Sequence, residues 1–168
     1  MADGALGDVA ARILNAAVSV LESTHLRAPS STMIAVGQLA DDCCDFVALE
    51  LTRAGPCPEG RFPVALTGPD QVGPGCGSIA FVEFRLVVGR QVPTLKVADE
   101  RELPSPTEIT AAGLAMVADA EAIVEQWRPE AAAIAASVDR LIAFGTMRAR
   151  TVTGGCGGLE WPFQLETP

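Results

Sequence analysis

The residues with the greatest capacity for chemistry are the cysteines and the only histidine, His25. A cysteine nucleophile needs a neighbouring base or another group that lowers its pKa. We expect His25 to face solvent at the end of a helix, where the helix dipole favours it, so no cysteine has an obvious histidine base. The five cysteines are an odd number, and we expect reduced thiols packed as small hydrophobic side chains. They are Cys43, Cys44, Cys57, Cys76 and Cys156.

The sequence predicts no metal, cofactor or catalytic site. The cysteines lack the CxxC pairs of a zinc site, and Asp41, Asp42 and Asp45 lack the alternating ligand spacing of a calcium loop. The glycine-rich run at residues 73–78 precedes a strand and is not followed by Gly-Lys-Ser/Thr, which excludes a phosphate-binding loop. The second glycine run, around Cys156, is typical of a flexible hairpin.

Charge and length restrict the class of protein. Twelve basic and 21 acidic residues give a net charge of -9, which opposes general binding to nucleic-acid phosphates. No apolar stretch is long enough to span a membrane, and the acidic N-terminus does not resemble a signal peptide, so we expect neither. We expect the protein to stay in the cytoplasm where it is made, and residues 1–168 to form a single domain.

The first half of the chain is predicted to hold one helix, two strands and a long loop. Apolar residues recur at helical spacing over residues 5–24, and the polar residues 25–37 form a connection. Alternation of period two predicts strands over residues 43–53 and 78–88. Residues 54–77 are rich in proline and glycine, so we expect a long loop that acts as a functional arm or becomes ordered on a partner.

The second half begins with a helix signal. Ser105-Pro106-Thr107-Glu108 is a capping box, after which a helix runs to about residue 127 and buries Ile109, Ile123 and Trp127. We expect Pro129 to interrupt this helix, with a second helical piece over residues 130–143 following at an angle.

Two short strands are predicted to complete the chain, over residues 145–152 and 159–166. Pro162 cannot donate a hydrogen bond to a neighbouring strand, which suggests an edge position or a bulge. The element order predicts an α+β fold, with a mostly antiparallel four-stranded sheet, helices packed on one face, and the long loop between the first two strands.

Charged residues at alternate positions predict a solvent-facing sheet surface. Glu83 and Arg85 share one face of a strand, where they can pair with neighbouring strands or cross a subunit boundary. Arg148 and Arg150 share a face of the strand over residues 145–152, where pairing with Glu160 or Glu166 is more plausible than binding a phosphate.

Three stretches of the chain resemble the tail terminator proteins of long-tailed, siphovirus-type phages that infect actinobacteria. The first is Asp42–Leu49, with Phe62-Pro63 in the following loop; the second runs from Cys76 through Ala80–Leu86 to Gln91-Val92-Pro93; the third is Gly154–Trp161. With Ala118-Asp119-Ala120, the resemblance extends from about residue 40 to the end of the chain. The sequence departs from the family at Gly89-Arg90, where a cysteine often precedes the Val-Pro pair.

The resemblance implies a structural virion protein at the junction of tail and neck. Such a protein forms a homo-hexameric ring on the tail tube protein, ends tail polymerisation and joins the tail to the head-side connector protein. DNA passes through the lumen of that ring, and an acidic subunit does not adsorb it. The expected interface residues are Arg61, Phe62, Glu83, Arg85, Arg148 and Arg150.

Two alternatives stay open from the sequence. A neighbouring head-to-tail connector, such as a head-completion or stopper protein, has the same features of composition. A small cysteine-dependent hydrolase or a ligand-binding module belongs to a different class. The hydrolase would require a strongly acidified, reactive thiol at Cys156.

Overall fold

The computed structural model describes residues 5–24, 29–36, 45–57, 62–64, 80–93, 103–153 and 155–167. The helices are α1 (Leu6–Ser23), α2 (Pro106–Ala122) and α3 (Arg128–Ala136), and a π-helical turn, η2 (Ile123–Trp127), joins the last two. The strands are β1 (Ser31–Val36), β2 (Phe46–Pro56), β3 (Ala80–Gln91), β4 (Ile142–Phe144), β5 (Arg148–Thr153) and β6 (Cys156–Thr167).

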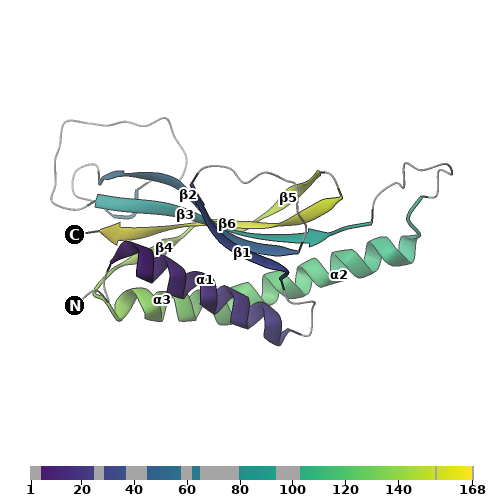
Figure 1. Ribbon diagram of the computed structural model, residues 1–168, viewed down its shortest axis with the longest axis horizontal. Helices are drawn as coiled ribbons and strands as arrows, with labels where there is room; N and C mark the ends of the chain where they lie inside the picture. Colours follow the sequence, from purple (N-terminus) through teal and green to yellow (C-terminus); the bar gives the residue numbers. More distant parts are fainter. Residues whose placement is uncertain are drawn as a thin grey trace.

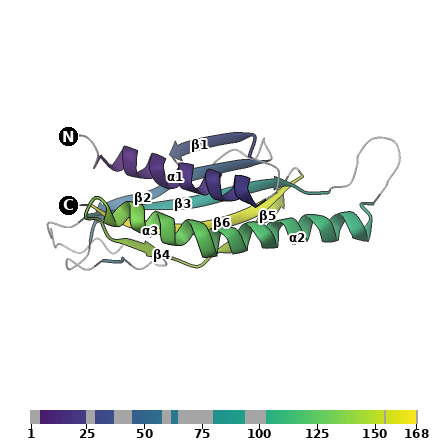
Figure 2. The same cartoon turned by 90° about the horizontal axis from the view of Figure 1, so that it is seen from below.

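The strands form one mixed sheet, and the helices cover one of its faces (Figure 1). The strand order is β1-β2-β3-β6-β4, and β5 also pairs with β6, next to β4. β1 runs parallel to β2, whereas the other pairs are antiparallel. Seen from the helix side, α1 lies toward β1 and β2, and the long α2–η2–α3 helix lies toward β6 and β4 (Figure 2).

The α+β class predicted from the sequence fits this architecture, but the predicted sheet is wrong. It has six strands and is mixed, not four-stranded and mostly antiparallel. The two missed strands are β1, within the predicted connection 25–37, and β4, at the end of the predicted helix 130–143. Their backbones gain partners from β2 and β6, which are distant in sequence, and local patterns do not reveal such pairing. Residues 54–56 of the predicted loop belong to β2, so the predicted loop starts too early and follows the second strand instead of the first. Most of residues 54–77 lie outside the described part of the chain.

The long helix differs from the prediction at Pro129. The capping box is confirmed: the Ser105 hydroxyl accepts a hydrogen bond from the Glu108 backbone, and the Glu108 carboxylate accepts one from the Ser105 backbone. The interruption at Pro129 is wrong, because the chain stays helical from Pro106 to Ala136. In the π-helical turn the backbone N–H of Arg128 donates to the carbonyl of Ile123, five residues earlier. This wider turn accommodates proline in the first turn of α3.

Trp127 occupies the centre of the core between helices and sheet. Its side chain is fully buried, and its ring centroid lies 5.7 Å from that of Trp161 and 5.8 Å from those of Phe144 and Phe163. Its indole N–H donates to the carbonyl of Ile13 in α1 at 3.0 Å. One side chain therefore joins α1, the long helix, β4 and β6.

The outer part of α2 is less buried than the sequence suggests. Ile123 and Trp127 are buried as predicted, but Ile109 is 55% exposed. α2 extends past the end of the sheet (Figures 1 and 2), so its first turns have no sheet beneath them. Among the described residues no helix is long and apolar enough to cross a membrane.

Pro162 lies in the interior strand β6, not at the edge of the sheet or in a bulge as predicted. β6 pairs with β3 on one side and with β4 and β5 on the other. The carbonyl of Pro162 accepts a hydrogen bond from Gly145, which lies between β4 and β5. In an antiparallel strand the N and O of one residue face the same side, so the missing N–H of Pro162 faces this break between the two strands.

Gly158 provides a test of the β3–β6 packing. It lies opposite Gly89, and a Cβ at Gly158 would overlap the backbone carbonyl of Val88. We expect Gly158→Ala to lower the free energy of unfolding by about 1–3 kcal/mol, since backbone atoms must move.

The matched control is Gly113→Ala in α2, where a Cβ has open space around it. This change should raise the free energy of unfolding by about 0.5–1 kcal/mol, because alanine loses less conformational entropy in a helix. Urea unfolding followed by circular dichroism measures both. Equal effects of the two changes would contradict the close strand packing.

Candidate functional site

Four of the six predicted interface residues lie on one surface, the sheet face opposite the helices. This surface, called the open face here, carries Glu83 and Arg85 from β3 and Arg148 and Arg150 from β5. Phe62 is half-buried and precedes Pro63 through a cis peptide bond. Arg61 lies outside the described residues. The sequence therefore predicted correctly that these charged residues share a face. The prediction that this face is solvent-facing is wrong for part of it, because Phe46, Ala48 and Val87 form a buried apolar cluster there.

A buried carboxylate lies at the middle of the open face. Glu50 of β2 is only 1% exposed, and its carboxylate oxygens lie 3.7 Å from Arg85 and 3.6 Å from Arg150. Arg85 also contacts Glu160 of β6 at 3.3 Å. A carboxylate removed from water needs opposite charges to offset its desolvation, and two arginines from different strands supply them. The network thus connects β2, β3, β5 and β6 across the sheet.

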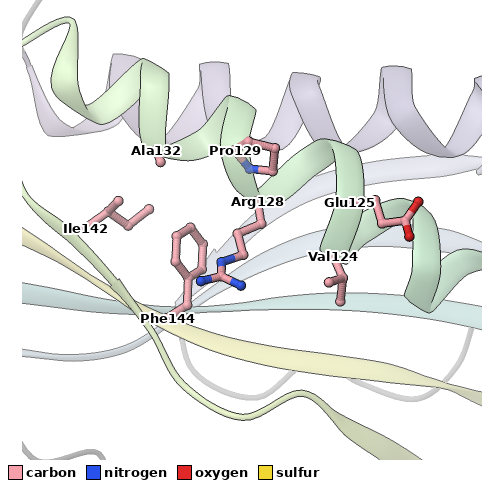
Figure 3. A pocket seen from close by; sticks show the side chains of 7 residues that line it. All are labelled: Val124, Glu125, Arg128, Pro129, Ala132, Ile142 and Phe144. Carbon is pink, nitrogen blue, oxygen red and sulfur yellow. The ribbon is translucent and has the colours of Figure 1, made fainter.

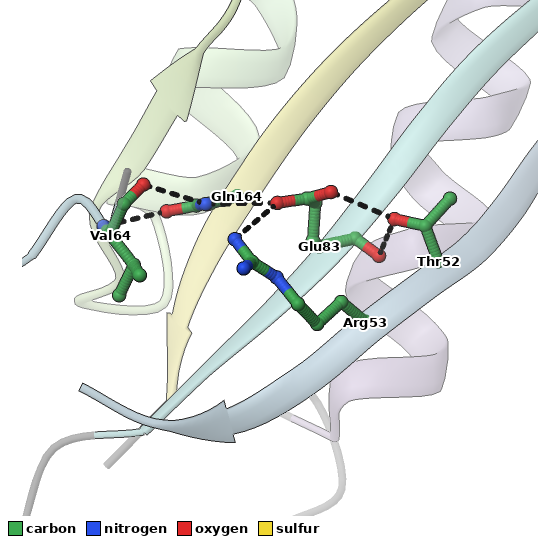
Figure 4. A network of polar contacts seen from close by, with 5 residues as sticks. All are labelled: Thr52, Arg53, Val64, Glu83 and Gln164. Atoms are coloured by element: carbon green, nitrogen blue, oxygen red, sulfur yellow. Dashed lines mark hydrogen bonds and ion pairs between the residues drawn. The ribbon is translucent and has the colours of Figure 1, made fainter. Parts of the chain in front are cut away.

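A second polar network lies where β2 ends and β3 begins (Figure 4). Glu83 accepts hydrogen bonds from Arg53 at 3.0 Å, from Thr52 at 3.1 Å and from Gln164 of β6 at 3.0 Å. The fully buried Gln164 side chain also bonds both backbone groups of Val64, each at 2.9 Å. A single amide side chain therefore holds the segment 62–64 against β6.

Among the described members of the predicted set, Arg148 is the exposed one. It lies opposite Glu160 in the β5–β6 register, while the carboxylate of Glu160 contacts Arg85. The predicted pairing of Arg150 with Glu160 or Glu166 is wrong, because Arg150 pairs with Glu50. Arg148 lies opposite Glu160 in the strand register only.

The pairing of charges determines what the open face can do. Each of Glu50, Glu83 and Glu160 contacts at least one arginine, so each of these carboxylates is part of an ion pair. Among the described residues no group of histidine, cysteine or acidic side chains is arranged to hold a metal ion. The arrangement is suited to a stiff, polar surface.

The sequence pattern did not predict that two acidic side chains are buried. Glu50 alternates with the apolar Leu49 and Leu51, a pattern that predicts a solvent-facing position, yet it is buried. Asp119 of α2 is 1% exposed and makes a bidentate pair with Arg90 of β3, at 2.8 and 3.0 Å. Both acids lie within apolar runs, Phe46–Leu51 and Leu114–Ala120, and an acid in such a run signals a buried partner.

The cysteines differ from the expectation of reduced thiols. Cys156 is disulfide-bonded, so the expectation is wrong there. Cys57 is a free, buried thiol, as expected, and burial together with the nearby Glu166 carboxylate raises its pKa. Cys43, Cys44 and Cys76, like His25, lie outside the described residues.

An open groove of about 510 Å³ lies between the long helix and β4 (Figure 3). Its lining is apolar apart from two charged residues, and the Arg128 guanidinium lies 5.8 Å from the centroid of the Phe144 ring. The lining residues are Val124, Glu125, Arg128, Pro129, Ala132, Ile142 and Phe144.

Large apolar side chains are also exposed on β1, on α2 and on the segment before α2. The most exposed are Val36 at 85%, Leu103 at 75% and Leu114 at 64%.

The sequence matches no family model and no curated protein.

The Arg90–Asp119 pair predicts a large loss of stability when one partner is removed. Arg90→Met takes the bidentate arginine away from a buried carboxylate and should lower the free energy of unfolding by about 3–5 kcal/mol. Adding Asp119→Leu should restore most of the loss, because the double variant buries no carboxylate there. A double-mutant cycle measured by denaturant unfolding checks this, and additive effects would argue against the pair.

Cys57 should be unreactive in the folded protein. Its raised pKa keeps the thiol protonated at pH 8, and burial blocks access, so alkylation by iodoacetamide should be at least about tenfold slower than for an exposed thiol. Mass spectrometry of labelled peptides with and without urea measures this, with the unfolded chain as the control. Rapid labelling of Cys57 without urea would contradict the assignment.

Proposed function

We propose that this chain is a non-catalytic structural subunit of a phage virion, of the tail terminator type. Six copies form a ring on the tail tube, end its polymerisation and present a surface to the head-side connector at the neck. The observation that carries the proposal is which side chains are paired and which are exposed. Charges on the open face are paired with one another, while large apolar side chains are exposed on β1 and α2. Such a subunit has surface to bury on assembly and no described acid–base site.

The residues that carry the family resemblance support the proposal by their position. The motif Ala80–Leu86 lies in β3 and supplies Glu83 and Arg85 to the open face. The motif Gly154–Trp161 leads into β6, the strand that pairs with β3, β4 and β5. Asp119, from the helical motif, pairs with Arg90, which stands where the sequence departs from the family. The resembling stretches are therefore parts of one packed unit.

The acidic composition agrees with a ring through which DNA passes. A net charge of -9 per chain gives an assembly that repels phosphate groups, so the duplex can move without adsorbing to the wall. We propose no specific nucleic-acid site, because the arginines of the open face that the structure describes are engaged with carboxylates, except the exposed Arg148.

Two alternatives rank below this proposal. A head-completion or stopper protein has the same surface features and differs only in its partner. A cysteine-dependent hydrolase is disfavoured by the state of the two described cysteines, since Cys156 is disulfide-bonded and Cys57 is buried with a raised pKa.

The decisive experiment adds the purified chain to polymerising tail tube protein. We expect elongation to stop and the chain to appear at one end of each tube, with six copies per end. Electron microscopy of tube lengths and native mass spectrometry of the docked material measure these outcomes. An unrelated acidic protein of similar size is the control for non-specific charge effects.

A parallel sample contains portal complexes in place of tubes. Binding to the portal without any effect on tube growth would favour the connector alternative. A chain that leaves tube lengths unchanged and binds neither assembly would refute a role at the neck.

A further inference from the structure

The sheet has two outer edges that differ in character. Within the described residues no further strand pairs with β1 on its outer side, or with β4 and β5 on theirs. β1 has the sequence Ser-Thr-Met-Ile-Ala-Val, with no charged residue and no proline. Monomeric proteins commonly place charged residues or proline on an edge strand, because an edge without them pairs with other chains.

Exposed apolar side chains on β1 lie on the helix side of the sheet. Ile34 and Val36 are 48% and 85% exposed. Their register partners in β2, Leu49 and Leu51, belong to the core beneath the helices, and partners in adjacent strands point to the same face. Ile34 and Val36 therefore point to the helix side, beyond the area that α1 covers.

The opposite edge offers an apolar groove on the same side. Ile142 and Phe144 of β4 are paired with Leu165 and Phe163, whose side chains belong to the helix-side core, so the β4 side chains also point to the helices. They form the floor of the groove beneath Pro129 and Ala132 (Figure 3). Gly145 and Leu141 bond to β6, so by antiparallel alternation the backbone groups of Ile142 and Phe144 face away from β6.

Strand directions allow these two edges to meet. β1 is parallel to β2. The pairs β2–β3, β3–β6 and β6–β4 are each antiparallel. β1 and β4 therefore run in opposite directions. When two copies lie side by side in the same orientation, β1 of one is antiparallel to β4 of the next, and both helix layers are on the same side. Ile34 and Val36 then face the groove.

The charges of the two edges are also compatible. The groove carries one acid, Glu125, and one base, Arg128, while β1 brings no charge to it. A charged peptide would have to desolvate its own charge against this apolar floor, whereas β1 would not. A two-fold pairing of β1 with β1 would leave the groove unfilled, so the head-to-tail contact buries more apolar surface.

We infer that the β1 edge of one copy docks against the β4 edge and the adjoining groove of the next copy, in a head-to-tail contact. This inference rests on the proposed function, because a repeated contact of this type closes into a ring when its rotation is right. It specifies which parts of the chain meet in that ring.

The test uses two lysine variants, each on one half of the contact. Val36→Lys alters the β1 edge and Val124→Lys alters the groove, at side chains that are 85% and 43% exposed, so both chains should fold. Each variant alone should associate at least about 100-fold more weakly than the unaltered chain, because docking would desolvate an ammonium group. An equimolar mixture should form a one-to-one dimer and nothing larger, since only one intact half-contact of each kind is present.

Sedimentation velocity over a range of concentrations measures association, and circular dichroism verifies folding. Leu103→Lys, at a side chain 75% exposed and outside both edges, is the matched control and should associate like the unaltered chain. A monomeric mixture, a groove variant that assembles normally, or an unaltered chain that never associates would overturn the inference. Tube capping by Val36→Lys at full strength would overturn the edge contact alone, whereas head-to-tail association without capping would overturn only the proposed function.

Discussion

The burial of Trp127 is the interaction on which the arrangement of layers depends. An aromatic side chain of this size removes about 150–250 Å² from water, and here its aromatic partners come from β4 and β6. Its N–H satisfies a carbonyl of α1, so the same residue sets the distance between the two helical segments. The π-helical turn ends at Trp127 and lets the helix continue past Pro129. Phe144, from the same cluster, forms the floor of the groove.

The two faces and the edges of the sheet have separate roles. The helix side is the main apolar core, and the open face combines ion pairs around the buried Glu50 with a smaller buried apolar cluster of Phe46, Ala48 and Val87. Because these charges are paired with one another, they connect β2, β3, β5 and β6 across that face. The capacity to interact lies at the margins, where β1 is uncharged and exposed and where α2 extends past the sheet.

Local patterns predicted the elements whose stability comes from near neighbours. The capping box before α2 involves residues three positions apart, and the alternation over residues 78–88 gave β3 with the correct faces for Glu83 and Arg85. The same reasoning failed for β1 and β4, because short strands depend on partners distant in sequence. It failed at Pro129 because the standard helical hydrogen-bond pattern was assumed, whereas the π-helical turn shifts it by one residue.

By itself the sequence determined the α+β class, the positions of the first helix and the main strands, and the set of arginines and glutamates that share one face. These features follow from spacing over a few residues, and spacing is what a sequence records directly. Only the tertiary structure decided that Glu50 and Asp119 are buried, that their partners are Arg85, Arg150 and Arg90, and that the sheet has an uncharged edge opposite a groove. Such pairings join residues up to 100 positions apart, and they form only when burial makes an isolated charge or an open strand costly.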